Sequence, residues 1–135
     1  MEQPEITEMV NAQMPLGTTL GIRTFGDAKE IDATLEWKPE LCTAGGVLHG
    51  GVLMSLADAA GAVCAFLNLP EGSKGTTTIE SKTNFFGAVR EGEVRARSRP
   101  LHVGKTTIVV ETDVLDATGR RVARTTQTQA VLSGE

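Results

Sequence analysis

The chain has 135 residues, with 17 acidic and 13 basic side chains, so its formal net charge at pH 7 is -4. This length suits one domain, residues 1–135, built around one hydrophobic core. The acidic balance argues against a protein that holds nucleic acid or an anionic membrane through bulk positive charge, so we expect neither partner.

The first fourteen residues give no sign of export. They contain Glu2, Glu5 and Glu8, but no basic residue and no long apolar run. This pattern fits neither a secretory signal nor a membrane span, so we expect the protein to be cytoplasmic. The two cysteines, Cys42 and Cys64, lie far apart among apolar or small residues, which predicts reduced structural thiols.

Residues 4–14 are predicted to form a short amphipathic helix that lies across a sheet, because Ile6, Met9, Val10 and Met14 recur at helical spacing. Two strands are then expected within residues 18–37, with a turn near residues 26–27. In the second strand apolar residues alternate with polar ones; they are Ile31, Ala33, Leu35 and Trp37.

Residues 41–51 are rich in glycine, and residues 52–67 form a long apolar run in which only Ser55 and Asp58 are clearly polar. The sixteen residues from 52 to 67 suffice for about four helical turns. A helix that is apolar nearly all round is expected to be enclosed by protein. With Asp58 inside it, the run is too short and too polar to span a bilayer.

Four more strands are expected at residues 76–86, 93–102, 106–115 and 122–132, separated by turn signals. We expect these four to form a meander. The sequence thus predicts an α+β fold in which a mostly antiparallel sheet of about six strands wraps around one long central helix.

Asp58 is the most informative residue, because an unpaired carboxylate inside an enclosed helix would be costly. A structural Asp bonded to a neighbouring strand and a functional Asp explain it equally well when it is taken alone.

The glycine-rich segment 45–51 enters the helix with no Ser, Thr, Asp or Asn at the expected cap. The first amides of the helix therefore have no obvious side-chain acceptor. Gly50 and Gly51 leave room for a ligand oxygen at this positive helix end, although a tight turn explains paired glycines as well.

Gly50 and Asp58 are 58 - 50 = 8 residues apart, or roughly 12 Å along a helix. One carbonyl carbon cannot easily reach both within one chain. If both act on one substrate, two antiparallel helices from two subunits must bring them together, so catalysis would require a dimer.

Several motifs together resemble the PaaI-like hotdog thioesterases, which include enzymes of phenylacetate and 4-hydroxybenzoyl-CoA metabolism. The core of the likeness is His49-Gly50-Gly51-Val52-Leu53, followed by Leu56-Ala57-Asp58. The pattern continues through Thr77-Thr78-Ile79-Glu80, Asn84-Phe85-Phe86, Arg90-Glu91-Gly92-Glu93, His102-Val103-Gly104-Lys105-Thr106 and the hairpin 116–123. The resemblance implies a hotdog fold, hydrolysis of acyl-CoA, and no cofactor, since coenzyme A is part of the substrate.

The resemblance also implies roles for five residues. Asp58 would be the general base or nucleophile, and the Gly50 amide of the partner chain would polarise the thioester carbonyl. His49 would border the sulfur, and Thr78 would help to hold the attacking water. Thr43 stands where the family usually carries Asn or Gln, six residues before His49 (49 - 6 = 43), and this departure predicts modest turnover.

Further residues match places where the family contacts its substrate. They are Gly51, Phe85, Arg90, His102, Gly104, Lys105 and Thr106. Lys105 is the preferred candidate for the CoA phosphates, because these need cationic or N–H donors. Phe85 could line the acyl or pantetheine channel, but an aromatic residue in a strand is more often core. Arg95, Arg97 and Arg99 share one strand face, usually a solvated one, and are weaker CoA candidates.

Other chemistries have less support. His49 and His102 have no partners at metal-ligand spacings, so no metal is expected. The run 104–106 is not a P-loop, because Arg99 stands where its first glycine belongs, and Ser55 is not in a nucleophile elbow.

Two alternatives to the thioesterase stay open. One is a dehydratase or hydratase that uses His49 and Asp58, and the other is a non-catalytic acyl-CoA binder, which Thr43 would favour. The acyl group is not identified by the sequence. A site shared by two chains and exposed edge strands predict at least a homodimer, and the family resemblance implies a tetramer built from two dimers.

Overall fold

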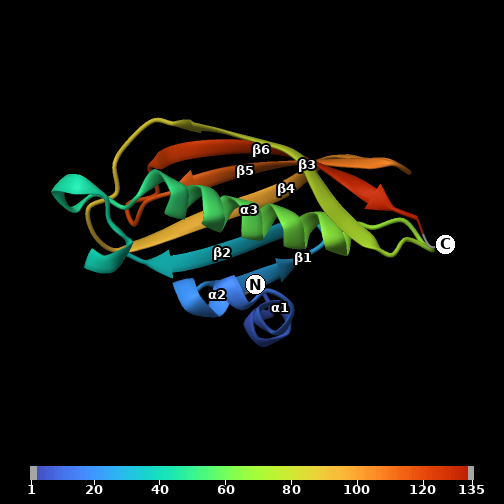
Figure 1. Cartoon of the computed structure of the whole chain (residues 1–135), viewed down its shortest axis with the longest axis horizontal. Coiled ribbons are helices and arrows are strands. Elements are labelled where there is room, and N and C mark those ends of the chain that lie inside the picture. Colours follow the sequence, from blue (N-terminus) through green and yellow to red (C-terminus); the bar gives the residue numbers. More distant parts are fainter. Residues whose placement is uncertain (1–2, 134–135) are drawn as a thin grey trace.

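A computed structural model describes residues 3–133, in which one antiparallel sheet wraps around one long helix (Figure 1). The helices are α1 (Thr7–Gln13), α2 (Pro15–Leu20) and α3 (Gly50–Leu67). The strands are β1 (Arg23–Asp27), β2 (Glu30–Glu36), β3 (Gly75–Phe85), β4 (Glu93–Val103), β5 (Thr107–Leu115) and β6 (Arg121–Leu132). Two short 3-10 turns, Pro39–Leu41 and Ala44–Gly46, precede α3. The predicted α+β fold is confirmed.

The sheet has six strands in the order β1-β2-β4-β5-β6-β3, and every neighbouring pair is antiparallel. The prediction that the last four strands form a meander is therefore wrong, because β3 pairs with β6 and not with β4. Alternation of apolar residues locates a strand but does not name its partner. Helix α3 crosses the face of the sheet between β2 and β3, so the chain after this helix can enter β3 at the sheet edge opposite β1.

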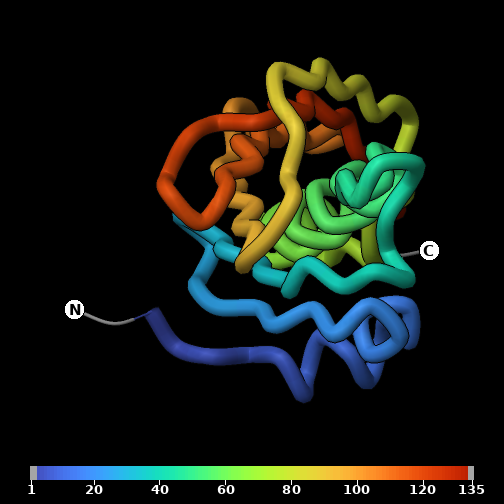
Figure 2. The backbone as a smooth tube through the Cα atoms, turned by 90° about the vertical axis from the view of Figure 1, so that its left-hand side faces the viewer, coloured from blue at the N-terminus to red at the C-terminus, as the bar shows by residue number. Residues whose placement is uncertain are grey.

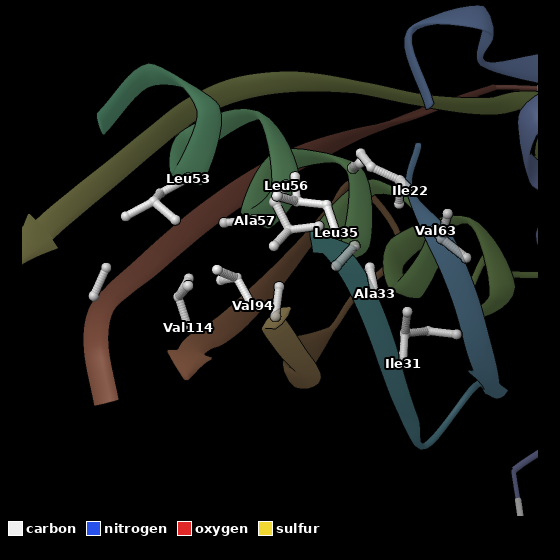
Figure 3. Packing of buried hydrophobic residues seen from close by; sticks show 14 of the residues in the cluster. Ile22, Ile31, Ala33, Leu35, Leu53, Leu56, Ala57, Val63, Val94 and Val114 are labelled. Carbon is white, nitrogen blue, oxygen red and sulfur yellow. The ribbon is translucent and has the colours of Figure 1, made fainter. Parts of the chain in front are cut away.

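The core forms between α3 and the concave face of the sheet, which Figure 2 shows curling around the helix while the N-terminal segment, in blue, lies to one side. Ile31, Ala33 and Leu35 of β2 face Leu56 and other buried residues of α3 (Figure 3). Burying each large aliphatic side chain contributes roughly 1.5–3 kcal/mol, so this contact holds α3 in place.

Several of the expected element boundaries differ from those in the structure. Residues 18–20 end a helix, α2, and are not part of a strand; this helix stops at Gly21, whose φ of 71° is the left-handed conformation that glycine adopts easily. Helix α3 begins at Gly50, two residues before the expected start. Its eighteen residues, with a mean hydropathy of 1.7, have the length and composition of a membrane span, but 44% of them are buried inside the molecule, and enclosed core helices pass the same test.

The expectation that α3 is enclosed on nearly every side does not hold within one chain. Met54 is 41% exposed, Asp58 is exposed and Phe66 is 57% exposed, although all three lie on a helix whose other side is fully buried. These residues follow one another at four-residue steps through Ala62, so they mark one face. An apolar sequence indicates that this face needs a cover, but not which chain supplies it.

The two cysteines are free thiols, and Cys64 is fully buried against the sheet. Burial raises the pKa of the Cys64 thiol to about 11, because the thiolate would lose its hydration there. A thiol with such a pKa stays protonated and inert near neutral pH, in agreement with a structural role.

Candidate active site

The N-terminus of α3 is capped by His49. Its Nδ1 accepts a hydrogen bond of 2.8 Å from the backbone N–H of Gly51. The expectation that no side chain caps this helix is therefore wrong, because the imidazole does what Ser or Asp usually does. A nitrogen that accepts carries no proton, so the ring proton lies on Nε2, which is left as a donor on this exposed residue.

Gly50 is the first residue of α3, and its backbone N–H has no hydrogen-bond partner among residues 3–133. The positive end of the helix dipole adds to this free donor, so the position favours an oxyanion. The ring of Phe85 packs on Gly50: a Cβ there would lie 3.2 Å from Phe85 Cζ. Phe85 is 49% exposed, so it belongs to this surface and not to the buried core where an aromatic strand residue was more often expected.

Asp58 lies two turns further along the exposed face of α3. Its Oδ1 accepts a hydrogen bond of 3.2 Å from Nε2 of Gln127, which comes from β6. Although the residue is exposed in the single chain, neighbouring atoms shield the carboxyl from water, and this burial raises the pKa of Asp58; the hydrogen bond from Gln127 lowers it to a smaller extent. The raised pKa brings the group closer to the range of a general base.

Gln127 is fully buried and reaches Asp58 across α3 at Gly61. A Cβ at Gly61 would collide with the Gln127 carboxamide, whose Cδ would be only 2.7 Å away. The other end of this carboxamide, Oε1, has no hydrogen-bond partner among the described residues and lies against the helix backbone at Gly61. Gly61 is thus the notch in α3 that lets a side chain of the sheet hold the carboxylate.

A second buried glutamine serves the other reacting candidate. Gln129, two residues from Gln127 on the same face of β6, donates from Nε2 to Oγ1 of Thr78 at 2.8 Å. Thr78 pairs with Gln129 in register, and a bulge at Ile79 follows. Sequence analysis missed both glutamines, although two amides in an otherwise inward-facing pattern of β6, together with a glycine inside a helix, could have pointed to them.

Thr43 and Arg90 lie near the N-terminal end of α3. Thr43 is exposed, and its backbone N–H donates to the carbonyl of Val47 at 2.8 Å. Arg90 Nη1 donates to the carbonyl of Gly45 at 3.2 Å, so its guanidinium lies beside the glycine turn.

The remaining candidates, His102, Gly104, Lys105 and Thr106, lie in and around the turn between β4 and β5. This turn is at the opposite end of the sheet from Phe85, because Thr107 pairs with Ala130 whereas Phe85 pairs with Ala123. One chain therefore does not bring Arg90 and Lys105 together. An antiparallel second chain would place the turn of one subunit at the Arg90 end of the other.

The outer-face arginines are used within the fold. Both Arg95 and Arg97 pair with the buried carboxylate of Asp32, at 2.8 Å and 3.0 Å, and Arg99 pairs with Glu30 at 3.0 Å. They stabilise the outer face of the sheet, which weakens them further as CoA contacts.

Comparison with known proteins identifies the family of the chain. Residues 45–123, more than half of the chain, match the family described as the thioesterase superfamily. The protein belongs to this superfamily. The match begins just before α3 and ends in β6, so it contains Gly50, Asp58 and Thr78.

Among curated relatives, the 1,4-dihydroxy-2-naphthoyl-CoA hydrolase of Escherichia coli is 34% identical over 87 residues, which make up 64% of this chain and 63% of that enzyme. The chain thus aligns with less than two thirds of that relative.

Among solved structures, a thioesterase from Haemophilus influenzae superposes with a TM-score of 0.86 at 27% identity, covering 99% of this chain and 96% of the other. A mutant thioesterase from Pseudomonas aeruginosa gives 0.87 at 27% identity, covering 95% and 94%. The PaaI protein of E. coli, at 20% identity, gives a TM-score of 0.84 over 94% of this chain and 91% of its own and shows the shared fold. The hotdog fold expected from the motifs is confirmed.

Proposed function

We propose that the protein hydrolyses an acyl-CoA thioester to a free acid and CoA. The observation that carries this proposal is Asp58: a carboxylate with a raised pKa, held by a buried glutamine on a helix face that one chain leaves open. Membership of the thioesterase superfamily supports the same reaction.

In the proposed reaction Asp58 acts as general base, or alternatively as nucleophile. As base, it takes a proton from water while the water oxygen attacks the thioester carbonyl carbon, with Thr78 helping to hold that water. The Gly50 N–H of the partner subunit stabilises the oxyanion. The C–S bond then breaks, the thiolate takes up the proton, and His49 Nε2–H lies beside the sulfur as a donor. Water, a carboxylate and amide donors suffice, so the proposal needs no cofactor or metal.

The positions of Gly50 and Asp58 on α3 support a dimer. Suppose that Gly50 of one α3 faces Asp58 of an antiparallel second α3. The residue numbers of any two facing positions on the two helices then add to 50 + 58 = 108, so position 54 faces position 54 of the other helix. The residue there is Met54, which is apolar and 41% exposed, as a two-fold contact requires. The exposed edge strand β3 lies beside this face and offers a second contact to the same partner. We propose a homodimer as the smallest active unit, and the family resemblance favours a tetramer of two such dimers.

The same antiparallel arrangement places the binding candidates. Arg90 of one subunit and the turn 102–106 of the other would then lie at one end of the shared site, where Lys105 and Thr106 can meet the CoA phosphates. Gly51 and Phe85 would border the thioester.

Complementation between two inactive variants tests the shared site. Asp58→Asn keeps an oxygen for Gln127 but cannot act as base. Gly50→Pro removes the free N–H, and proline is well tolerated at the first position of a helix, with His49 before it already extended at φ -59°, ψ 133°. We expect each variant alone to release almost no CoA thiol from a panel of aliphatic and aromatic acyl-CoAs.

Refolded together at equal amounts, the two variants should recover about a quarter of wild-type activity, because half of the dimers are mixed and each has one intact site. Recovery at this level supports a site shared by two chains. No recovery, with wild type active, would show that Gly50 and Asp58 do not work across subunits. Absence of wild-type turnover on every substrate, with acyl-CoA binding intact, would favour the non-catalytic binder.

A further inference from the structure

An apolar groove of about 440 Å³ lies between α1 and the second half of α3, both of which are labelled in Figure 1. Its walls are Met9 and Val10 of α1, Met14 directly after that helix, Ala62 and Phe66 of α3, and Thr76 at the start of β3. Its volume is in the range of small-molecule sites, and the described residues that line it include no charged side chain.

The groove lies next to Asp58 and Thr78, the proposed reacting residues, on both α3 and β3. Ala62 is one helical turn from Asp58, or roughly 6 Å along α3, and on the same face. Thr76 is two residues from Thr78, or roughly 7 Å along β3, and on the same side of the strand. A chain that starts at a carbonyl near Asp58 and Thr78 can therefore run directly into the groove.

From this arrangement we infer that the groove binds the acyl group, and that the protein prefers an uncharged, apolar acyl chain of medium length or an apolar aromatic one. The inference rests on the proposed thioesterase function and names its substrate class. A charged acyl terminus would lose its hydration in the groove without a partner to replace it.

The proposed dimer covers the open side of the groove with uncharged residues as well. Because α3 of the partner begins at Gly50, the part of α3 beyond Asp58 faces the segment that precedes that helix in the partner. Residues 42–46 are Cys, Thr, Ala and two Gly, so they add no charge to the pocket. Helix α1 is then the element that sets how long a chain fits.

Binding of S-alkyl-CoA thioethers, which cannot be hydrolysed, tests the groove apart from the reaction. Calorimetric titration with the ethyl, butyl, hexyl and octyl compounds should show a Kd that falls by up to about fourfold for each added methylene until the groove is full. A carboxyalkyl-CoA of the same length as the hexyl compound should bind at least about tenfold more weakly.

Met9→Glu and Leu16→Glu form a matched pair. Met9 is 57% exposed and lines the groove, whereas Leu16, 52% exposed, lies on α2 away from it. We expect Met9→Glu to flatten the dependence of Kd on chain length and Leu16→Glu to retain it. If the Kd of wild type does not depend on chain length, or if Met9→Glu leaves that dependence unchanged, the groove is not the acyl site.

Hydrolysis is measured separately on butanoyl-, hexanoyl- and octanoyl-CoA. A chain-length dependence of Kd that Met9→Glu removes, without turnover by wild type, would support the groove and contradict the thioesterase. If wild type and Met9→Glu both hydrolyse acyl-CoA with the same preference for chain length, the thioesterase function is supported and the groove is not the acyl site.

Discussion

At the scale of single residues, Asp58 and Thr78 are held by neighbours that are themselves buried. Gln127 and Gln129 are 0% and 1% exposed and donate from the same strand face to one group each. A buried amide has few alternative orientations, so it fixes the carboxylate more firmly than a water molecule would. Asp58 could be picked out from the sequence because a carboxylate in an apolar helix is rare. The partners of the two glutamines could not be read from it, since they lie 69 and 51 positions away in the chain.

The pH dependence of turnover should report the Asp58 carboxyl. Burial raises its pKa, and a general base acts in its ionised form, so kcat/KM should rise with pH through this raised value. Gln127→Leu removes the hydrogen bond that lowers the pKa, so the rising limb should move to higher pH. Gln129→Leu, whose target is Thr78, is the control and should lower turnover without moving that limb. An unmoved limb in Gln127→Leu would show that Asp58 is not the titrating base.

The raised pKa of Asp58 also determines how this residue affects folding stability as pH changes. A carboxyl whose pKa is higher in the folded than in the unfolded chain binds its proton more tightly when folded, so its contribution to stability is lost as pH rises above the unfolded value. Asp58→Asn is therefore expected to be at least as stable as wild type at pH 7. Denaturation at matched pH thus separates its loss of activity from misfolding.

At the scale of elements, α3 combines a core helix with a functional surface. Its buried side was predicted from apolar content alone, but its open face and its N-terminal cap were not. His49 is an uncommon cap, and only the local turn brings its Nδ1 to the Gly51 amide.

Gly61 gives the test at this scale. Glycine inside a helix normally costs about 1 kcal/mol relative to alanine, so Gly→Ala usually stabilises. Here the new Cβ would meet the Gln127 carboxamide, and we expect Gly61→Ala to destabilise by about 1–3 kcal/mol in chemical denaturation.

The sign should reverse when Gln127 is shortened. In the Gln127→Ala background the collision is gone, so Gly61→Ala should become neutral or stabilising. A double-mutant cycle with no coupling would mean that Gly61 is not the notch for Gln127.

At the scale of the whole molecule, the open face of α3 and the edge strand β3 lie together. Met54, Phe66 and Ile79 expose 41%, 57% and 61% of their surface, which is unusual for large apolar side chains beside a core. A second copy that covers this face would also complete the proposed site.

Met54→Glu is expected to convert the proposed dimer into monomers, because two carboxylates would meet at its two-fold position. Sedimentation velocity should show the change in mass, and thioesterase activity should fall with it. Leu16→Glu places the same charge on α2 and should leave both unchanged. Dimers that persist in Met54→Glu with full activity would refute the antiparallel arrangement of the two α3 helices.

What the sequence determined by itself was local: the apolar run of α3, the alternation of the strands, Asp58 within the helix and the glycines before it. These depend on periodicity and on residue chemistry, which are properties of short segments. Tertiary structure alone decided that β3 pairs with β6, that Gln127 passes Gly61 to reach Asp58, and that one face of α3 stays open. The reason is physical, since pairing, close approach and exposure depend on residues distant in the chain, whose meeting no local pattern encodes.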